Sequence, residues 1–227
     1  MTGVVIPARN EERSVGAIVR ATRTTLPAAH VVVVDDASGD TTAAAARTAG
    51  AHVVSLHSRV GYAEALRLGY RAVLAAAAGD VVQLDADGQH APENIEPLLA
   101  GLDRFDMVLG SRFLGATYPM PRARRTAIQA CRLMARLGGL SLTDPTSGFR
   151  AMRRPVAEAV AADGFPDGLT ESSFLIHLHR RGLTIGEIPV RMNPPQNGSM
   201  HDGVAGVKHF LHISRASVSV ALRRVPR

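Results

Sequence analysis

The stretch that decides the fold is Val31-Val32-Val33-Val34-Asp35-Asp36, in which four consecutive valines are followed by two aspartates. A strand that is buried on both faces of a parallel sheet reads as an uninterrupted apolar run of this kind. The stretch Val81-Val82-Gln83-Leu84-Asp85 has the same form, since a mostly apolar run again ends at an aspartate. Because ligands bind at the carboxyl ends of strands in open α/β sheets, the two stretches predict one acidic edge along a binding crevice.

Apolar runs alternate with helix-like stretches along the chain, which is typical of an α/β fold with a mostly parallel, Rossmann-like sheet flanked by helices. The pattern predicts strands at residues 4–6, 31–34, 52–56, 80–84, 107–110 and 184–191. It predicts helices at residues 12–24, 62–78, 122–137, 154–162 and 172–181, with two more after Asp40 and from Pro92. The last two helices are predicted because aspartate is a common N-cap residue and proline is favoured in the first turn of a helix.

The composition is that of a folded globular protein. Of the 227 residues, 46% are hydrophobic, and the single cysteine, Cys131, excludes an internal disulfide framework and a cysteine-rich zinc site. No uncharged apolar run reaches the roughly 18 residues of a membrane-spanning helix, and the first residues do not form a basic-then-apolar leader. We therefore expect a cytoplasmic protein, and peripheral contact with the inner face of a membrane stays open.

The chain is basic, with a formal net charge of +6 and a sequence pI of about 10.6. The candidate partners are nucleic acid, an anionic membrane surface and a phosphorylated ligand, and a basic surface without a specific partner stays open. Tryptophan is absent and no aromatic-rich basic motif occurs, which argues against nucleic acid. Residues 204–227 combine apolar side chains at helical spacing with basic ones. This pattern predicts a basic amphipathic C-terminal helix that either lies on an anionic membrane or packs on its own domain.

Asp85, Asp87 and Gln89 form the most informative group of polar residues. Alternate side chains of an extended segment point to the same side, so two carboxylates and an amide oxygen can face one cation. Oxygen ligands of this kind suit Mg²⁺ or Mn²⁺ rather than zinc. Paired aspartates are also common in turns. However, Asp36 and the loop of residues 7–11 are predicted at the same edge of the sheet, and this coincidence favours a metal and phosphate site.

Six short motifs carry a resemblance to a known family. The segments VIPARNEE (5–12), VVDDASGDTT (33–42) and DADGQH (85–90) resemble the GT-A glycosyltransferases of family 2. The segments GSRF (110–113), TDPTSGFR (143–150) and GEIPV (186–190) resemble the branch typified by dolichol-phosphate mannose synthase. The resemblance implies a GT-A catalytic domain over residues 1–203. Its nucleotide-sugar half would cover about residues 1–113, and its acceptor half about residues 114–203.

The resemblance also implies roles for individual residues. It implies direct displacement at the anomeric carbon of a nucleotide diphosphate sugar, with inversion, and a UDP-sugar and a GDP-sugar are both admissible. Asp85, Asp87 and Gln89 would hold Mg²⁺ or Mn²⁺, and Arg112 would contact the donor phosphate through its guanidinium fork. The residues implied in nucleotide-sugar binding are Pro7, Arg9, Glu11, Asp36, Asp85, Ala86, Asp87 and Arg112.

The catalytic base depends on the acceptor. A hydroxyl acceptor needs a general base, whereas a phosphate monoester, with a second pKa of about 6, is already an anion. Relatives that act on hydroxyls carry Glu-Asp before a helix, where this chain has Glu171 followed by Ser172. Glu171 and Asp144 are the remaining candidates for a base. The serine favours a phosphate acceptor such as a polyprenyl phosphate.

The loop after residue 191 points the other way. Polyprenyl-phosphate relatives place an arginine in this loop, and here a proline occupies the corresponding position. A soluble small-molecule acceptor therefore stays open, with Ser199 and His201 as candidate acceptor contacts. A sugar-phosphate nucleotidyltransferase would need a glycine-rich start, which Pro7-Ala8-Arg9-Asn10 is not. A non-catalytic scaffold that binds a nucleotide or a membrane is the remaining alternative.

Overall fold

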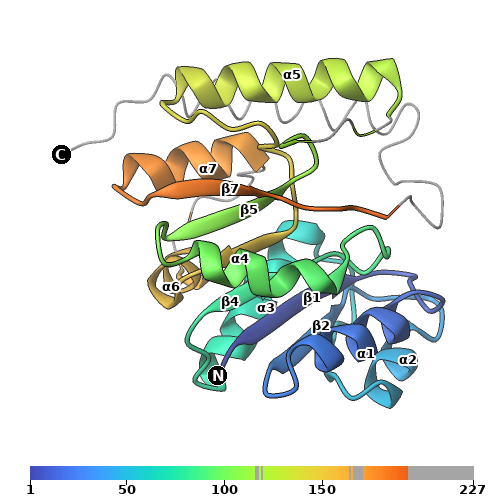
Figure 1. The fold of residues 1–227 in the computed structure, drawn as a ribbon. Helices are drawn as coiled ribbons and strands as arrows, with labels where there is room; N and C mark the ends of the chain where they lie inside the picture. The colour runs from blue at the N-terminus through green and yellow to red at the C-terminus, as the bar shows by residue number, and fades with distance from the viewer. Residues whose placement is uncertain (116–117, 119, 164, 166–170, 194–227) are drawn as a thin grey trace.

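The computed structural model describes residues 1–115, 118, 120–163, 165 and 171–193. Seven strands form one sheet in the order β3-β2-β1-β4-β6-β5-β7 (Figure 1). Only β6 runs against its neighbours, pairing antiparallel with β4 and with β5. The mixed α/β fold with a mostly parallel sheet is therefore confirmed. The strands are β1 Gly3–Ala8, β2 His30–Asp35, β3 His52–Ser55, β4 Val81–Gln83, β5 Met107–Ser111, β6 Arg150–Met152 and β7 Ile185–Pro189.

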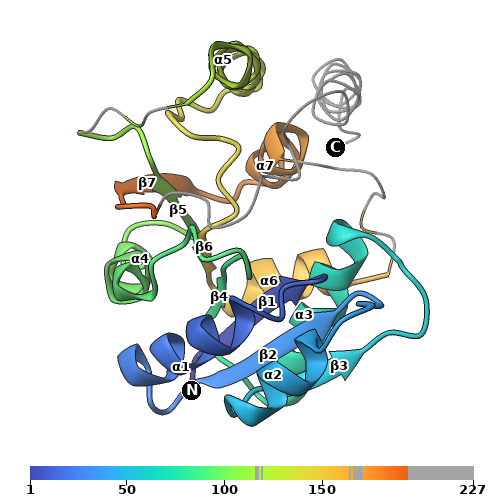
Figure 2. The same cartoon turned by 90° about the vertical axis from the view of Figure 1, so that its right-hand side faces the viewer.

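Helices cover both faces of this sheet, with α1, α2 and α4 on one side and α3, α6 and α7 on the other (Figure 2). Helix α5 lies farther out and packs on α7. The helical elements are α1 Val15–Thr25, α2 Thr42–Thr48, α3 Tyr62–Ala75, the 3-10 turn η1 Pro92–Asn94, α4 Ile95–Gly101, α5 Arg122–Leu137, α6 Arg154–Ala161 and α7 Glu171–Arg180.

The valine run of β2 matches the burial of this strand on both of its faces. Val32 and Val34 pack into the apolar cluster beneath α3 and α6. Val31 and Val33 pack into the opposite cluster, beneath α1 and α4. All four side chains are at most 2% exposed. Alternate side chains of a strand point to opposite faces, so an unbroken apolar run is what a doubly covered strand requires.

Several element boundaries differ from the expectations. Strand β6 was not predicted, because Arg150-Ala151-Met152 is too short to show a period and begins with a buried arginine. Helix α1 begins at Val15 rather than near residue 12, and α3 ends at Ala75. The N-cap of α2 is Thr41 rather than Asp40, although an Asp40 carboxylate oxygen accepts the Thr42 N–H at 2.9 Å. Asp40 thus supports the first turn from one position earlier.

The carboxyl ends of three parallel neighbours meet at one edge. In the sheet register Ala8 of β1 lies beside Asp35 of β2, and Val5 lies beside Gln83 of β4. The loops after these strands carry residues 9–11, Asp36 and Asp85. The acidic edge predicted from the sequence is therefore present.

Two expectations fall wholly outside the described residues. The amphipathic helix of residues 204–227 and the acceptor candidates Ser199 and His201 belong to the undescribed segment 194–227. Within the described part of the chain, no helix has the length and apolar character needed to cross a membrane.

Candidate active site

The loops after β1 and β2 are hydrogen-bonded to each other and form one side of the candidate site. The N–H of Asn10 donates to Ser38 Oγ at 3.0 Å, and Asn10 Oδ1 accepts the Gly39 N–H at 2.9 Å. Asn10 has a φ of 56°, a left-handed conformation that asparagine tolerates better than most residues. The N–H of Glu11 donates to Thr42 Oγ1 at 2.8 Å. The loop after β1 is thereby fixed against the loop after β2.

Asp36 connects the loop after β2 to the loop before α3. Its two carboxylate oxygens accept the N–H groups of Val60 at 2.7 Å and Gly61 at 3.0 Å. Arg9 donates to the main-chain oxygen of Asp36 at 3.4 Å. Asp36 is only 5% exposed. In this conformation the carboxylate therefore holds the loop before α3, while Arg9 stays partly exposed beside it.

Carboxylates gather at the edge of the sheet. Ser14 Oγ donates to Glu11 Oε2 at 2.8 Å. Burial raises the pKa of the Glu11 carboxyl, and the negative charges of Asp87, Asp40 and Asp85 raise it further. Like charges so placed repel each other unless a cation or a proton lies between them. The electrostatics of this edge therefore favour a bound cation.

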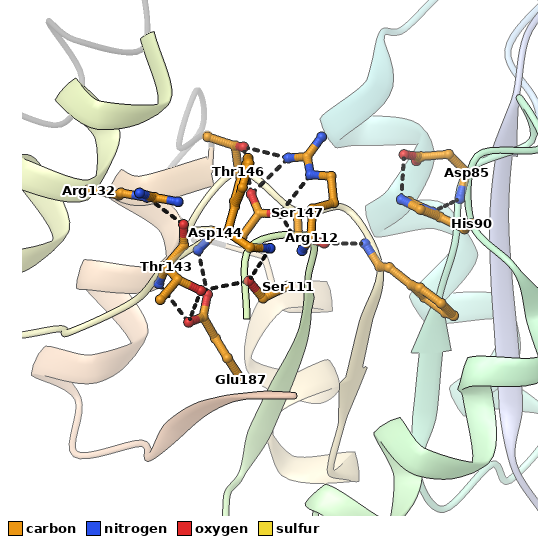
Figure 3. A network of polar contacts seen from close by, with 12 residues as sticks. Asp85, His90, Ser111, Arg112, Arg132, Thr143, Asp144, Thr146, Ser147 and Glu187 are labelled. Atoms are coloured by element: carbon orange, nitrogen blue, oxygen red, sulfur yellow. Dashed lines mark hydrogen bonds and ion pairs between the residues drawn. The ribbon is translucent and has the colours of Figure 1, made fainter. Parts of the chain in front are cut away.

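Asp85 is contacted by Tyr62 and by His90. Tyr62 Oη, at the start of α3, donates to Asp85 Oδ1 at 2.7 Å. The N–H of Asp85 donates to His90 Nδ1 at 2.8 Å, and His90 Nε2 lies 3.6 Å from Asp85 Oδ2 (Figure 3). Since Nδ1 accepts a hydrogen bond, the proton of the neutral ring is on Nε2, facing the carboxylate. Burial lowers the pKa of His90 and favours this neutral form.

Asp87 and Gln89 form a compact turn beside Asp85. Asp87 Oδ1 accepts the N–H of Gln89 at 2.9 Å, and Asp87 Oδ2 accepts Gln89 Nε2 at 2.6 Å. Asn193, just beyond β7, donates its N–H to the main-chain oxygen of Gln89 at 2.9 Å. Across the described residues, no three His, Cys, Asp or Glu side chains converge on one point. The predicted ligand set therefore has two carboxylates, Asp85 and Asp87, and depends on the amide of Gln89 as its third member.

These residues fit a hard divalent cation in their chemistry. A carboxylate has about four lone-pair positions, so Asp85 and Asp87 retain acceptor capacity beyond the bonds described. The main chain at Gly148 approaches the group closely, since a Cβ built there would lie 2.9 Å from Asp85 Oδ2. That approach leaves space beside the carboxylate that a side chain would fill.

Arg112 and Asp144 form a second polar centre, shown in Figure 3. Arg112 Nε donates to Asp144 Oδ2 at 2.6 Å, and Arg112 Nη2 donates to Oδ1 at 2.8 Å. The Arg112 N–H also donates to Oδ2 at 3.2 Å, and Thr146 Oγ1 accepts a bond from Nη2 at 3.0 Å. Arg112 is 6% exposed and Asp144 is fully buried. This geometry favours Asp144 as a support for Arg112 over Asp144 as a base.

Glu187 of β7 holds the loop that carries Asp144. Its carboxylate accepts the N–H groups of Thr143 and Asp144, each at 2.6 Å, and the Thr143 hydroxyl at 2.9 Å. Ser111 Oγ lies 2.6 Å from Thr143 Oγ1. Burial raises the pKa of the Glu187 carboxyl. Sequence reasoning gave Glu187 no role, although its position in the GEIPV motif was a signal that could have found it.

A cavity of about 290 Å³ opens beside this second centre. Arg132 crosses one side of it, with its guanidinium 4.7 Å from the Phe113 ring centroid and its Nε–H bonded to the Thr143 carbonyl. Figure 3 shows Arg132 and Thr143 next to the Arg112–Asp144 pair. The cavity therefore combines apolar and cationic surface. It is lined by Phe113, Tyr118, Met120, Arg125, Ile128, Gln129, Arg132 and Thr143.

The remaining candidates have simpler positions. Pro7 is buried within β1, and Ala86 is buried between the two aspartates at 3% exposure. Glu171 is the first residue of α7, and its side chain is not among those described. Tyr62 and His90, which contact Asp85, were missed in the sequence. Their contacts depend on how α3 and the loop after β4 pack, which no local pattern reports.

A known protein family matches most of this chain. The sequence profile described as Glycosyl transferase family 2 matches residues 3–161. The chain belongs to this family. The assignment confirms the family resemblance, and five of the six motifs lie within the matched residues. The protein is a glycosyltransferase.

Curated relatives of this glycosyltransferase support the branch as well as the family. It is 32% identical over 219 residues to the undecaprenyl-phosphate mannosyltransferase of Micrococcus luteus, which covers 89% of this chain and 88% of that protein. It is 34% identical over 216 residues to the polyprenol monophosphomannose synthase of Mycolicibacterium smegmatis, over 87% and 79% of the two chains. It is 32% identical over 206 residues to the dolichyl-phosphate hexose transferase of Haloferax volcanii, over 89% and 87%.

Solved structures confirm the fold. Glucosyl-3-phosphoglycerate synthase from Mycobacterium tuberculosis, in complex with Mn²⁺, uridine-diphosphate and phosphoglyceric acid, matches with a TM-score of 0.70. The match covers 99% of this chain and 80% of that chain, at 21% sequence identity. At that identity the likeness establishes the GT-A architecture alone.

Proposed function

We propose that this glycosyltransferase moves a sugar from a nucleotide diphosphate sugar to a polyprenyl phosphate, with inversion and with the help of a divalent cation. The polyprenyl-phosphate acceptors in the names of the three relatives support the acceptor class. The Mn²⁺ or Mg²⁺ and uridine-diphosphate in the solved neighbours are consistent with the donor site. Both a UDP-sugar and a GDP-sugar fit this proposal.

The donor would bind along the acidic edge of the sheet. The nucleoside would lie between the loops after β1 and β2, where Pro7, Arg9, Glu11 and Asp36 would contact it. Asp85, Asp87 and Gln89 would hold Mg²⁺ or Mn²⁺, which would neutralise the diphosphate as a leaving group. Burial and the neighbouring carboxylates raise the pKa of Glu11, which is the electrostatic observation in favour of a cation there.

Arg112 is proposed to bind donor phosphate through its guanidinium, whose planar fork of N–H donors matches a phosphate. Asp144 would fix the plane of the fork, and Glu187 would fix the loop that carries Asp144. The orientation of a phosphate-binding arginine is thereby set before the substrate arrives, which lowers the entropic cost of binding.

The cavity beside Arg132 is the observation that carries the acceptor assignment. Its apolar side chains, among them Met120 and Ile128, suit hydrocarbon, whereas Arg125 and Arg132 suit an anion. A phosphate attached to a polyprenyl chain presents both kinds of surface. Such an acceptor needs positioning more than a base, because its phosphate is already an anion near pH 7. Glu171 remains the candidate base for the alternative, a hydroxyl on a soluble small molecule.

Location and domain division complete the proposal. We propose peripheral association with the inner face of a membrane, where a polyprenyl phosphate would be presented. Residues 1–203 would form the catalytic domain, and residues 204–227 a basic amphipathic helix at the membrane surface.

Transfer assays with two acceptors test the proposal. Labelled GDP-mannose and UDP-glucose would each be supplied with Mn²⁺ and either undecaprenyl phosphate in detergent or 3-phosphoglycerate. The proposal expects transfer to the lipid phosphate from one of the two donors. It also expects R125Q to raise the KM for undecaprenyl phosphate, while R124Q, a change one position away on α5 and outside the cavity lining, leaves it unchanged. Transfer to 3-phosphoglycerate alone would overturn the polyprenyl assignment in favour of a soluble acceptor.

A further inference from the structure

A chain of three hydrogen bonds leads from the protein core to the carboxylate of Asp85. Tyr70 Oη donates to Gln83 Oε1, and Gln83 Nε2 donates to Tyr62 Oη at 3.0 Å. Tyr62 Oη in turn donates to Asp85 Oδ1 at 2.7 Å. Gln83 is fully buried on β4 and Tyr70 is 2% exposed on α3. Tyr62 is 46% exposed, so the chain of bonds runs from the interior to the surface of the site.

The direction of each bond follows from the chemistry of the groups. A tyrosine hydroxyl has one proton to donate, and a glutamine amide has an acceptor end and a donor end. Tyr70 places its proton on the amide oxygen of Gln83, which turns the NH₂ group toward Tyr62. The Tyr62 oxygen accepts from that group, so its own proton is available for Asp85. A reversed amide would instead draw the Tyr62 proton to Gln83 and leave Asp85 without this donor.

The consequence for Asp85 is a fixed carboxylate orientation. Asp85 Oδ1 accepts the hydrogen bond from Tyr62. Hydrogen bonds to a carboxylate belong to the stronger class in proteins. Oδ2 is directed toward His90 Nε2 and the main chain at Gly148. A Cβ on Gly148 would lie 2.9 Å from Asp85 Oδ2 and 3.1 Å from Tyr62 Oη, so the glycine leaves room for both groups. Neither carboxylate oxygen can turn freely.

We propose that Tyr62 is a positioning residue that holds Asp85 in its cation-binding orientation before the cation arrives, and that Gln83 and Tyr70 set the direction of its hydrogen bond. This inference rests on the proposed donor site, in which Asp85 is a ligand. Hydrogen bonds to the ligands of a metal orient them, and their loss commonly lowers metal affinity by about 10-fold to 100-fold.

Binding of Mn²⁺ in the presence of UDP or GDP, whichever the wild-type protein binds, tests the inference. The Kd would be measured by electron paramagnetic resonance for the wild type, Y62F, Y70F and the double variant Y62F/Y70F. Because Phe keeps the ring and removes only the hydroxyl, we expect folded proteins, with thermal unfolding as the check. Y62F is expected to weaken Mn²⁺ binding about 10-fold. Y70F is expected to weaken Mn²⁺ binding less than Y62F does. In Y70F the Tyr62 hydroxyl is still present, and only one of the bonds that orient the Gln83 amide is lost.

The double variant distinguishes a relay from two separate effects. If Tyr70 acts through Tyr62, the double variant binds Mn²⁺ no more weakly than Y62F alone, since coupled residues are not additive. An unchanged Kd in Y62F, or additive losses in the double variant, would overturn the relay while the donor site stands. Failure of the wild type to bind Mn²⁺ with either nucleotide would overturn the donor site and the relay together.

Discussion

Replacing Asp144 with alanine removes the carboxylate partner of a guanidinium that has almost no access to water. Arg112 is 6% exposed and Asp144 is fully buried, and Arg112 makes two charged bonds to it at 2.6 and 2.8 Å. Each hydrogen bond to a charged group is worth about 1.5–3 kcal/mol, so the two together amount to about 3–6 kcal/mol. The loss of one member of a buried ion pair independently suggests about 3–5 kcal/mol. We therefore expect D144A to lower the free energy of unfolding by about 3–5 kcal/mol.

The assay is equilibrium unfolding in urea at pH 7, with the transition followed by circular dichroism. The control is R112M/D144A, which removes both charges and replaces the guanidinium by an apolar side chain. Because the cost arises from a buried guanidinium that has lost its carboxylate, the double variant should be more stable than D144A. A D144A protein within about 1 kcal/mol of the wild type would refute the reasoning, since that is the range of an exposed ion pair. So would a double variant less stable than D144A.

Three further predictions concern the donor site. D87A is expected to abolish the Mn²⁺ dependence of nucleotide binding measured by calorimetry, and a titration identical to the wild type would remove Asp87 from the metal site. G148A is expected to weaken Mn²⁺ binding because its Cβ meets Asp85 Oδ2, whereas G79A, whose Cβ has one neighbour at 3.7 Å, should not; equal effects would contradict this. Burial lowers the pKa of His90 below its ordinary 6.5, so the folded protein binds this proton less readily than the unfolded chain. Its contribution to stability is present above pH 6.5 and is lost as the pH falls from 6.5 toward the folded pKa. In urea unfolding, H90N should reduce the loss of unfolding free energy at acid pH without abolishing it, because burial also lowers the pKa of His177. An unchanged pH dependence of stability in H90N would contradict the assignment.

The sequence predicts well where one residue pattern has one physical cause. Residues 31–34 predict a strand that is buried on both faces, because four consecutive valines place apolar side chains on each face. The acidic edge follows from the topology, since parallel strands bring their carboxyl ends together. Strand β6 is not predicted by the same reasoning, because its three residues, beginning with Arg150, are too few to show a periodic pattern.

The site is less predictable because its geometry depends on contacts between distant segments. Asp144 had been a candidate base, yet it lies 32 positions from Arg112 and is bonded to it. Glu187 supports that loop from 44 positions away, and Tyr62 reaches Asp85 from 23 positions away. Residue types at these positions show that polar groups exist, but only the packing of α3, β5 and β7 shows which groups meet.

The central claim is that the acidic edge of the sheet is a cation-dependent nucleotide site, and calorimetry of nucleotide binding tests it most directly. Uridine diphosphate and guanosine diphosphate would each be titrated into the wild-type protein with Mn²⁺ and, separately, with a chelator. The account predicts binding of one nucleotide with Mn²⁺ and a marked loss of affinity with the chelator. Binding of neither nucleotide to the folded protein, or equal affinity with and without the cation, would contradict it.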